Sequence, residues 1–174
     1  MQHVLDRARQ VQLMIFDVDG VLTDGRIYYS DSGEEMKAFS TLDGHGIRML
    51  MSSGVAVAIL TGRRSEVVTH RARNLGITHV LQGIDNKRTA FIALAASLQV
   101  AASNCGYMGD DVVDLPVMSR CGFAVATREA PEIVRERAHF VASQPAGAGA
   151  AREVCETVMR AQGTLDAALA PYLD

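Results

Sequence analysis

The sequence has few cysteines and no long hydrophobic run, and each shortage excludes a class of protein. Its three cysteines, Cys105, Cys121 and Cys155, are odd in number and widely spaced, so neither a disulfide framework nor a zinc site is expected. We expect all three to be reduced packing residues, because free cysteine behaves as a small hydrophobe. No apolar stretch is long enough to span a bilayer, which predicts no membrane partner. The first residues lack the apolar core of a signal peptide, so a cytoplasmic location is expected.

The chain also lacks a strong excess of charge of either sign. Its formal net charge of -3 gives no electrostatic reason to expect nucleic acid as a partner. Hydrophobic residues make up 48% and charged residues 21%, a balance typical of a folded globular protein. A length of 174 residues leaves room for one domain of ordinary size, which we expect to span residues 1–174.

Short apolar runs alternate with helical patterns along most of the chain. Because these runs are apolar throughout rather than alternating, they indicate a parallel sheet covered on both faces. The predicted fold is therefore α/β, with a doubly wound, Rossmann-like parallel sheet. Expected strands lie at 12–17, 55–60, 79–81, 105–108, 123–125 and 140–141. Expected helices lie at 43–53, 65–74, 86–98 and 130–136, with one more beginning at 111 or 112, a link at 145–149 and one terminal helix over 150–168.

A β-hairpin is predicted over 26–39, where it interrupts the alternation of strands and helices. Two β-prone runs flank Asp31-Ser32-Gly33, a sequence typical of a turn. A hairpin that carries Tyr28, Tyr29 and Phe39 cannot bury both of its faces by itself. It must fold onto the domain or pair with another subunit, and we favour pairing because an isolated hairpin needs a partner surface.

Four groups of polar residues follow predicted strands or begin the next helix. They are Asp17-Val18-Asp19, Thr61-Gly62, Lys87, and Gly109-Asp110-Asp111 with Asp114. Parallel strands bring their carboxyl ends to one edge of the sheet, so these side chains should gather there. Neighbouring carboxylates repel one another where water is scarce, and a hard divalent metal would relieve that repulsion.

Such a set of side chains suits phosphoryl transfer to a carboxylate. A metal neutralises charge on the phosphoryl oxygens, while a lysine and a hydroxyl bind the remaining ones. Aspartate is a recognised nucleophile in aspartyl-phosphate chemistry, and a second acid must protonate the leaving alkoxide and then activate water. Asp17 and Asp19 lie two residues apart and face the same side, which fits a division of these two tasks.

Over nearly its whole length the chain resembles the haloacid dehalogenase superfamily of phosphatases. The four groups of residues above match the four motifs of that superfamily in order, beginning with Asp17-Val18-Asp19-Gly20-Val21-Leu22-Thr23. The resemblance implies that Asp17 is the nucleophile and Asp19 the general acid/base. It implies that Mg²⁺ is bound by Asp17, Asp110 and the backbone carbonyl of Asp19, supported by Asp111 and Asp114. Thr61, Gly62 and Lys87 would bind the transferring phosphate.

A narrower resemblance is to the 3-deoxy-D-manno-octulosonate 8-phosphate phosphatases of lipopolysaccharide precursor synthesis. Matching segments are Thr23-Asp24-Gly25, Gly33-Glu34-Glu35, Lys37, Phe39, Asp43-Gly44, Gly46-Ile47, Leu60-Thr61-Gly62-Arg63 and Arg152-Glu153-Val154-Cys155-Glu156. This family implies a core without a cap domain, and a homotetramer in which hairpins meet and a neighbouring subunit closes each site. It also implies contacts to the carboxylate and hydroxyls of the sugar acid from Ser40, Thr41, Leu42, Asp43, Gly44, Arg48, Arg63 and Arg71. Arginine suits this task because its fork pairs with a carboxylate through two bonds.

Two features depart from that family's usual pattern. His45 stands where the family often has tyrosine, and we expect a packing role for it. The segment Ala146–Ala150 lacks the arginine that the family often carries in its tail. Any contact of that arginine with a neighbour's substrate is therefore in doubt.

Three alternatives compete with this interpretation. A phosphate-accepting signalling receiver domain would place its acceptor aspartate between the acidic pair and Thr61, and it has no use for Asp110 and Asp111. A non-catalytic regulatory subunit would have no structural need for both Asp17 and Asp19. A phosphatase of a related nine-carbon sugar acid phosphate stays open, because both substrates carry the carboxylate and the terminal phosphate.

Overall fold

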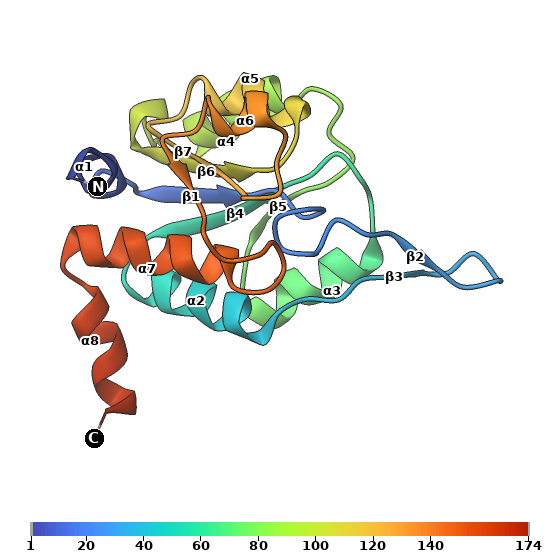
Figure 1. The fold of residues 1–174 in the computed structure, drawn as a ribbon, viewed down its shortest axis with the longest axis horizontal. Helices are drawn as coiled ribbons and strands as arrows, with labels where there is room; N and C mark the ends of the chain where they lie inside the picture. The colour runs from blue at the N-terminus through green and yellow to red at the C-terminus, as the bar shows by residue number, and fades with distance from the viewer. Residues whose placement is uncertain (1, 174) are drawn as a thin grey trace.

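A six-stranded parallel sheet lies at the centre of the computed structural model, which describes residues 2–173 (Figure 1). The spatial order of its strands is β5-β4-β1-β6-β7-β8, and every neighbouring pair is parallel. The chain order runs outward from β1 in both directions, so β1 lies at the switch point where ligands bind in such folds. The bounds are β1 Leu13–Phe16, β4 Ala56–Leu60, β5 His79–Leu81, β6 Cys105–Gly109, β7 Phe123–Ala126 and β8 Phe140–Val141. The predicted doubly wound sheet is confirmed.

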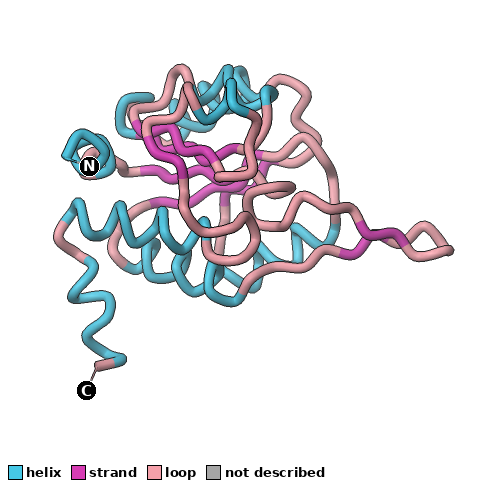
Figure 2. Tube along the Cα trace, viewed as in Figure 1, coloured by secondary structure: helices cyan, strands magenta, loops and turns pink. Residues whose placement is uncertain are grey.

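Helices cover both faces of this sheet (Figures 1 and 2). On one face lie α2 (Thr41–Ser52), α3 (Glu66–Leu75) and α7 (Ala150–Gln162), and α1 (Gln2–Ala8) packs beside α7. On the other face lie α4 (Lys87–Ser97), α5 (Leu115–Met118) and α6 (Glu132–Arg135). Short 3₁₀ turns occur at Ala102–Asn104, Val112–Asp114 and Ala170–Tyr172. The described residues form no separate cap domain, as the resemblance implied.

Strand β1 is buried on both faces because the two layers of helices enclose it. Its side chains alternate between two hydrophobic cores, with Met14 and Phe16 in the core beneath α2 and α7. Leu13 and Ile15 lie in the opposite core, which α4 and α5 cover. The expected run of apolar strand residues is explained by this double burial. Asp17 follows directly, so its backbone is held by a strand whose residues are all buried.

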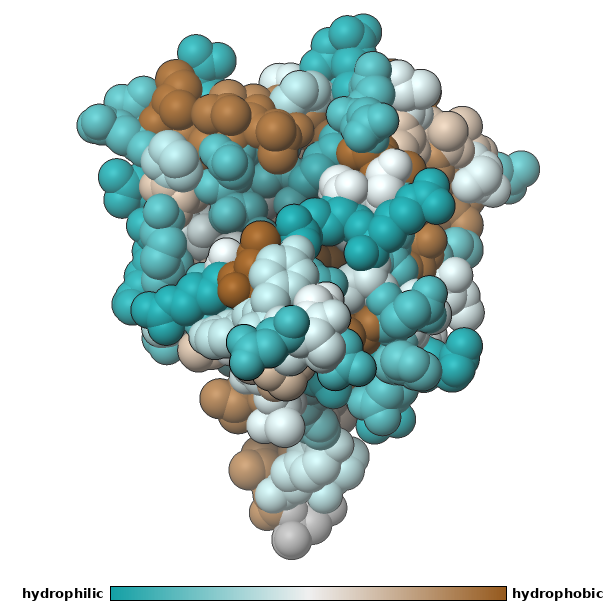
Figure 3. Space-filling view, turned by 90° about the vertical axis from the view of Figure 1, so that its right-hand side faces the viewer, coloured by the Kyte–Doolittle hydropathy of each residue, from teal (hydrophilic) through white to brown (hydrophobic). Residues whose placement is uncertain are grey.

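The inserted hairpin projects from the domain beside the carboxyl edge of the sheet (Figure 1). Its arms, β2 (Tyr28–Tyr29) and β3 (Glu35–Met36), pair antiparallel, as predicted, but each arm is only two residues long. Its large apolar side chains are exposed: Ile27, Tyr28, Tyr29 and Met36. Figure 3 views this side of the molecule, where hydrophobic patches lie among hydrophilic side chains. The hairpin thus leaves apolar surface without a partner inside the domain.

The prediction of one continuous carboxyl-terminal helix over 150–168 is wrong. Helix α7 ends at Gly163, whose φ of 72° places it in the left-handed region that closes a helix. A second helix, α8 (Leu165–Leu169), then leads away from the body of the domain (Figure 1). The helical spacing of apolar residues continues past Gly163, but the left-handed backbone of this glycine ends the helix. The helix expected at 111 or 112 likewise begins as a 3₁₀ turn and becomes α-helical only at Leu115.

The three cysteines are buried and free, in agreement with their predicted packing role. Burial raises the pKa of the Cys105 thiol to about 11, which keeps it protonated at neutral pH. Among residues 2–173, no helix combines the length and hydrophobicity that crossing a membrane requires.

Candidate active site

The polar residues singled out in the sequence gather at the carboxyl edge of the sheet. A cavity of about 250 Å³ opens there. Its lining comes from the segments that directly follow β1, β4 and β6 and from the start of α4. The lining residues include Asp17, Asp19, Thr61, Gly62, Arg63, Lys87, Asp110 and Asp111. The topology thus brings together all four groups of polar residues at one edge of the sheet, as the direction of parallel strands predicted.

Asp17 lies at the base of the cavity and is 6% exposed. Its Oδ1 accepts a hydrogen bond from the backbone N–H of Val18 at 2.7 Å, and its Oδ2 accepts one from Lys87 Nζ at 2.5 Å. Burial raises the pKa of Asp17 to about 6, with a further contribution from the negative charge of Asp114, and the ammonium of Lys87 opposes both. Added positive charge beside Asp17 would therefore favour its ionised form.

The turn after Asp17 brings the chain close to Asp110. Gly20 has a φ of 80°, and a Cβ atom at this position would overlap the Asp110 carboxylate. Glycine is therefore required both for the backbone conformation and for the close approach. The hydroxyl of Thr23 accepts hydrogen bonds from the N–H groups of Gly20 and Gly25, each at 3.3 Å, and so holds the turn. The sequence motif thus packs two acidic loops against one another.

Asp114 is fully buried and its carboxylate has four hydrogen-bond donors. Oδ1 accepts from Lys87 Nζ at 2.6 Å and from the Tyr107 hydroxyl at 2.5 Å. Oδ2 accepts from the backbone N–H groups of Asp110 at 2.9 Å and Asp111 at 3.1 Å. These bonds fill the lone-pair positions of the carboxylate. Asp114 therefore orients Lys87 and the Asp110–Asp111 loop.

Asp17, Asp110 and Asp114 each offer an oxygen within 4.8 Å of the others. Because the oxygens of Asp114 are already engaged, Asp17 and Asp110 are the two carboxylates left to bind a cation. Burial, together with the negative charges of Asp114 and Asp17, raises the pKa of Asp110 to about 7, and the ammonium of Lys87 opposes this increase. A buried and a half-buried carboxylate whose charges repel one another fit a hard divalent cation such as Mg²⁺.

Lys87 is 5% exposed and joins Asp17 to Asp114 from the first turn of α4. Asn86 caps this helix, since its side chain accepts from the Thr89 N–H at 3.0 Å. Burial works to lower the pKa of Lys87, but the charges of Asp17 and Asp114 outweigh it and raise the pKa. The lysine is thus a fixed cation inside the cavity. Thr61, at the end of β4, lines the same cavity and is 2% exposed.

Asp19 lies on the side of the cavity that faces the hairpin. The Lys37 ammonium bonds its Oδ1, and Arg63 Nε lies 3.8 Å from its Oδ2. Arg63 also donates to the Tyr29 hydroxyl at 2.9 Å and to Glu35 Oε1 at 3.1 Å. Hairpin residues therefore hold the second carboxylate of the motif, whereas sheet residues hold the first.

The residues expected to contact the sugar acid occupy different places. Ser40 caps α2, and its backbone carbonyl accepts from Arg71 Nη2 at 2.9 Å. The Arg71 guanidinium also lies over the Phe39 ring, 5.7 Å from its centroid. Thr41 and Leu42 are exposed at the start of α2, and Gly44 lies where a Cβ atom would meet Arg71. Among the residues expected to contact the sugar acid, only Arg63 lines the cavity with Asp17 in the part of the chain that the structure describes.

Asp43 has a different environment from the one expected. It is 2% exposed, and its carboxylate accepts from the N–H groups of Gly149 at 3.2 Å and Arg152 at 2.9 Å. These contacts cap α7 and tie it to α2, so a substrate contact for Asp43 would have to replace them. Burial raises the pKa of Asp43 and these N–H groups oppose the increase. A structural role accounts for its contacts, and its predicted contact with the substrate stays a prediction.

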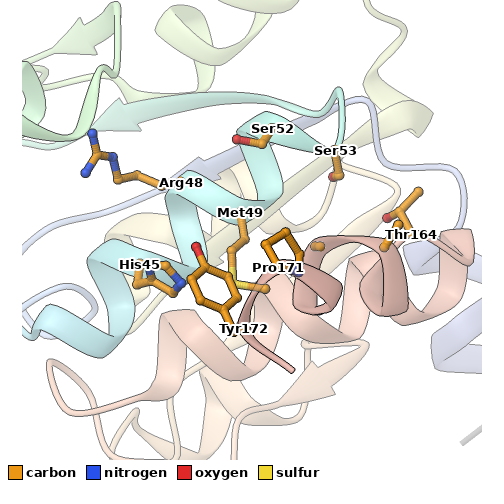
Figure 4. Close-up of a pocket in the computed structure, with 10 residues that line it drawn as sticks. His45, Arg48, Met49, Ser52, Ser53, Thr164, Pro171 and Tyr172 are labelled. Carbon is orange, nitrogen blue, oxygen red and sulfur yellow. The ribbon is translucent and has the colours of Figure 1, made fainter. Parts of the chain in front are cut away.

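Arg48 lines another cavity, of about 630 Å³, between α2 and the carboxyl-terminal segment (Figure 4). His45 projects into the same cavity, where its ring meets Tyr172 edge to face at 5.3 Å between centroids. This contact agrees with the packing role expected of His45. Arg48 lies outside the cavity that contains Asp17 within this chain, and its predicted substrate contact stays a prediction.

Sequence reasoning missed Tyr107 and undervalued Lys37. Tyr107 lies inside an apolar strand run. A tyrosine in a strand expected to be buried was the available signal, because a buried phenol hydroxyl needs a hydrogen-bond partner. Lys37 was noted only as part of a motif. Its contact with Asp19 spans 18 residues, and no local pattern predicts it.

Comparisons with known proteins agree with this geometry. A family model described as haloacid dehalogenase-like hydrolase matches residues 78–154. The 3-deoxy-D-manno-octulosonate 8-phosphate phosphatase of Salmonella typhi is 46% identical over 166 residues, which cover 95% of this chain and 88% of that protein.

Two solved structures have nearly the same fold. A probable YrbI family phosphatase from Pseudomonas syringae is 46% identical with a TM-score of 0.98, covering 100% of this chain and 99% of that one. The 3-deoxy-D-manno-octulosonate 8-phosphate phosphatase of Moraxella catarrhalis, solved with magnesium, phosphate and the KDO molecule, is 40% identical with a TM-score of 0.97 over 99% of each chain.

Proposed function

This chain belongs to the haloacid dehalogenase-like 3-deoxy-D-manno-octulosonate 8-phosphate phosphatases, and we propose from that premise how its own residues carry out the reaction. The protein is a phosphatase that hydrolyses the 8-phosphate of this sugar acid to the free sugar acid and phosphate, a reaction of lipopolysaccharide precursor synthesis. The observation that carries the assignment is the buried Asp17 carboxylate, paired with Lys87 at the carboxyl edge of the sheet.

Asp17 attacks phosphorus in the first step. A bond forms between one of its carboxylate oxygens and phosphorus while the bond from phosphorus to the sugar oxygen breaks. Asp19 gives its proton to the departing sugar oxygen, so the leaving group is an alcohol rather than an alkoxide. In the second step Asp19 takes a proton from water as the water oxygen attacks the acyl-phosphate. This regenerates Asp17 and releases phosphate.

Thr61, Gly62 and Lys87 bind the transferring phosphate. All three line the cavity beside Asp17, where the hydroxyl, the backbone N–H and the ammonium provide donors for phosphoryl oxygens. Lys87 is held in place by Asp114, which in turn accepts from Tyr107. The ammonium is therefore oriented before substrate arrives, and this preorganisation favours the transition state.

Mg²⁺ is the cofactor, held by Asp17, Asp110 and the backbone carbonyl of Asp19. The raised pKa values of Asp17 and Asp110 support this proposal, because they mark two carboxylates that lack sufficient positive charge. When bound, the ion neutralises charge on the phosphoryl oxygens. Asp111 and Asp114 shape the loop that carries Asp110. Asp111 does so by accepting the Val112 N–H at 2.7 Å.

The sugar-acid end of the substrate extends outward from the phosphate, past Arg63. Ser40, Gly44 and Arg71 line another pocket together with Val18, the residue after Asp17, and the Arg71 guanidinium can pair with a carboxylate. Arg48 reaches the substrate only if a neighbouring subunit brings it to the site. The exposed apolar hairpin supports a homotetramer that assembles through it, since burying Tyr28, Tyr29 and Met36 removes apolar area from water. The single-domain organisation and the cytoplasmic location stay predictions.

A screen of phosphate release across sugar phosphates tests the function. The expected result is the highest kcat/KM on the eight-carbon keto acid 8-phosphate in the presence of Mg²⁺. A higher value on the nine-carbon analogue would favour the alternative substrate, which the exchange of tyrosine for His45 and the missing tail arginine keep open. A flat profile over simple sugar phosphates would contradict both.

A further inference from the structure

The hairpin arm that returns to the domain buries a lysine while its neighbours stay exposed. The side chain of Lys37 is 1% exposed, whereas Met36 beside it is 58% exposed. Burying an ammonium is costly unless it is paired, so its partners matter. They are Asp19, which it contacts through Oδ1, and Glu35, whose Oε1 lies 3.2 Å from Lys37 Nζ.

The two oxygens of Asp19 differ in how they are held. Oδ1 takes the Lys37 ammonium, while Oδ2 lies 3.8 Å from Arg63 Nε, too far for a hydrogen bond. Arg63 is 42% exposed and spends its other donors on Tyr29 and Glu35, so its hold on Asp19 is weak. Lys37 is therefore the group that sets the orientation of this carboxyl, which lines the cavity, and its Oδ2 is not held by a hydrogen bond from Arg63.

We propose that Lys37 is a positioning residue for Asp19, through which the hairpin orients the proton donor of the reaction. This inference rests on the proposed function, because it requires Asp19 to give a proton to the leaving oxygen. Lys37 itself neither gains nor loses a proton. It binds Oδ1 and thereby holds Oδ2, the oxygen that carries the proton, towards the bond between phosphorus and the sugar oxygen. The hairpin then has two tasks, which are assembly through its exposed face and orientation of Asp19 through its buried lysine.

The leaving group of the substrate separates this role from others. An alkoxide, such as that of a sugar or of glycerol, is a poor leaving group and depends on the proton from Asp19. A nitrophenolate leaves without it. A misplaced proton donor should therefore slow alkyl phosphates in kcat/KM, which reports the step that breaks the ester bond, and should leave 4-nitrophenyl phosphate nearly unaffected.

Three substitutions at one position test the proposal with Mg²⁺ present and with both substrate types. Lys37→Met keeps the length of the side chain and removes its charge, and Lys37→Gln keeps polarity if the methionine variant does not fold. Lys37→Arg keeps the charge. We expect Lys37→Met to lower kcat/KM for the alkyl phosphate about 30- to 100-fold and that for 4-nitrophenyl phosphate less than about threefold. Lys37→Arg should recover most of the loss.

The matched control is Arg26→Met, which removes an exposed cation from the same hairpin. Its side chain is 78% exposed and its partner is Asp24, at 3.6 Å. We expect it to leave the ratio between the two substrates unchanged. Light scattering on each variant shows whether the oligomer is retained. A loss of assembly by Lys37→Met that is accompanied by equal loss on both substrates would contradict the proposal.

Two further results would overturn it. Equal losses on both substrates would assign Lys37 to phosphate binding or to folding. A rise in KM for the sugar acid phosphate with unchanged kcat would assign it to a contact with the substrate. Asp19→Asn, measured alongside, separates a failure of this proposal from a failure of the proposed function. If Asp19→Asn slows the alkyl phosphate and 4-nitrophenyl phosphate equally, Asp19 is not the proton donor, whatever the Lys37 variants show.

Discussion

On the sheet side of the cavity, Asp17, Lys87 and Asp114 are buried and joined by ion pairs of 2.5 and 2.6 Å. On the hairpin side, the Asp19 carboxylate is 21% exposed and Arg63 is 42% exposed, and only Lys37 is fully enclosed. The sheet side is built from β1, β6 and α4, which pack within the two hydrophobic cores. The hairpin side depends on two strands of two residues each.

This difference indicates a division of mechanical roles. The proposed nucleophile Asp17 and the Lys87 ammonium beside it need a fixed geometry, and the fully buried strand β1 supplies it. The proposed proton donor, Asp19, is held by an inserted element whose apolar surface still lacks a partner within the described residues. Its position is therefore open to influence from assembly, whereas that of Asp17 is not. Substitutions on the two sides should therefore have different effects.

The largest effect is expected from Asp17→Asn on the sheet side. The amide cannot attack phosphorus, so turnover should fall by at least about 10⁴-fold. Folding should persist, because Lys87 keeps its bond to Asp114. Phosphate release and circular dichroism would measure the two properties. The control is Asp85→Asn, the same exchange at an exposed position before α4, and full activity in Asp17→Asn would remove Asp17 as the nucleophile.

The stability of the metal-free protein should depend on pH through the sheet side. The folded pKa values of Asp17 and Asp110, about 6 and about 7, lie above the ordinary value of 3.8. Between about pH 4 and pH 7 the folded state therefore binds more protons than the unfolded state, and stability falls as pH rises through that window. At about 1.4 kcal/mol per pKa unit, Asp17 alone accounts for roughly 3 kcal/mol.

Urea unfolding at several pH values, with a chelator and with Mg²⁺, measures this dependence. With the chelator we expect the free energy of unfolding to fall between about pH 4 and pH 7. With Mg²⁺ this fall should be smaller, because a bound cation favours the ionised carboxylates. A chelated protein whose stability rises from pH 4 to pH 7 would contradict the assigned environments of Asp17 and Asp110.

Tyr107→Phe should have a smaller effect on the same side. It removes one donor from the buried Asp114 carboxylate, which we expect to cost about 2 kcal/mol of stability. Activity should fall about tenfold, because Lys87 is then held less firmly. Tyr172→Phe removes an exposed hydroxyl and serves as the control in both urea unfolding and phosphate release. Equal stability and equal activity of the two variants would show that the hydrogen bond from Tyr107 to Asp114 contributes to neither.

The smallest effect on activity is expected on the hairpin side, from Met36→Asp. A charge on this exposed apolar position should prevent hairpins from meeting, so the protein should elute as smaller species in light scattering. Activity on 4-nitrophenyl phosphate, which has no sugar acid for a neighbouring subunit to bind, should fall only a few-fold, because the sheet side is unchanged. Ile92→Asp, at an exposed position on α4, is the matched control. A monomeric wild-type protein would contradict assembly through the hairpin.

Much of the sheet side was predictable from the sequence. The apolar run before Asp17 predicted a buried strand, and parallel strands necessarily bring Thr61, Lys87 and Asp110 to the same edge. The four motifs in their order were enough to predict a phosphatase of this family. The break at Gly163 was not predicted, because the hydrophobic pattern of α7 continues past the residue that ends the helix.

The contacts that orient the site were decided by the tertiary structure. Asp43 caps a helix that begins more than a hundred residues later, and the Tyr107 hydroxyl meets Asp114 only because β6 and the following turn fold over one another. Lys37 reaches Asp19 because the hairpin returns across the cavity. The strands and the edge where the candidate reacting groups gather could be predicted from the sequence, since they follow from local hydrophobicity and from the single direction of parallel strands. The tertiary structure decided which partner each charged group takes, because a buried charge pairs with whatever the packing brings within reach.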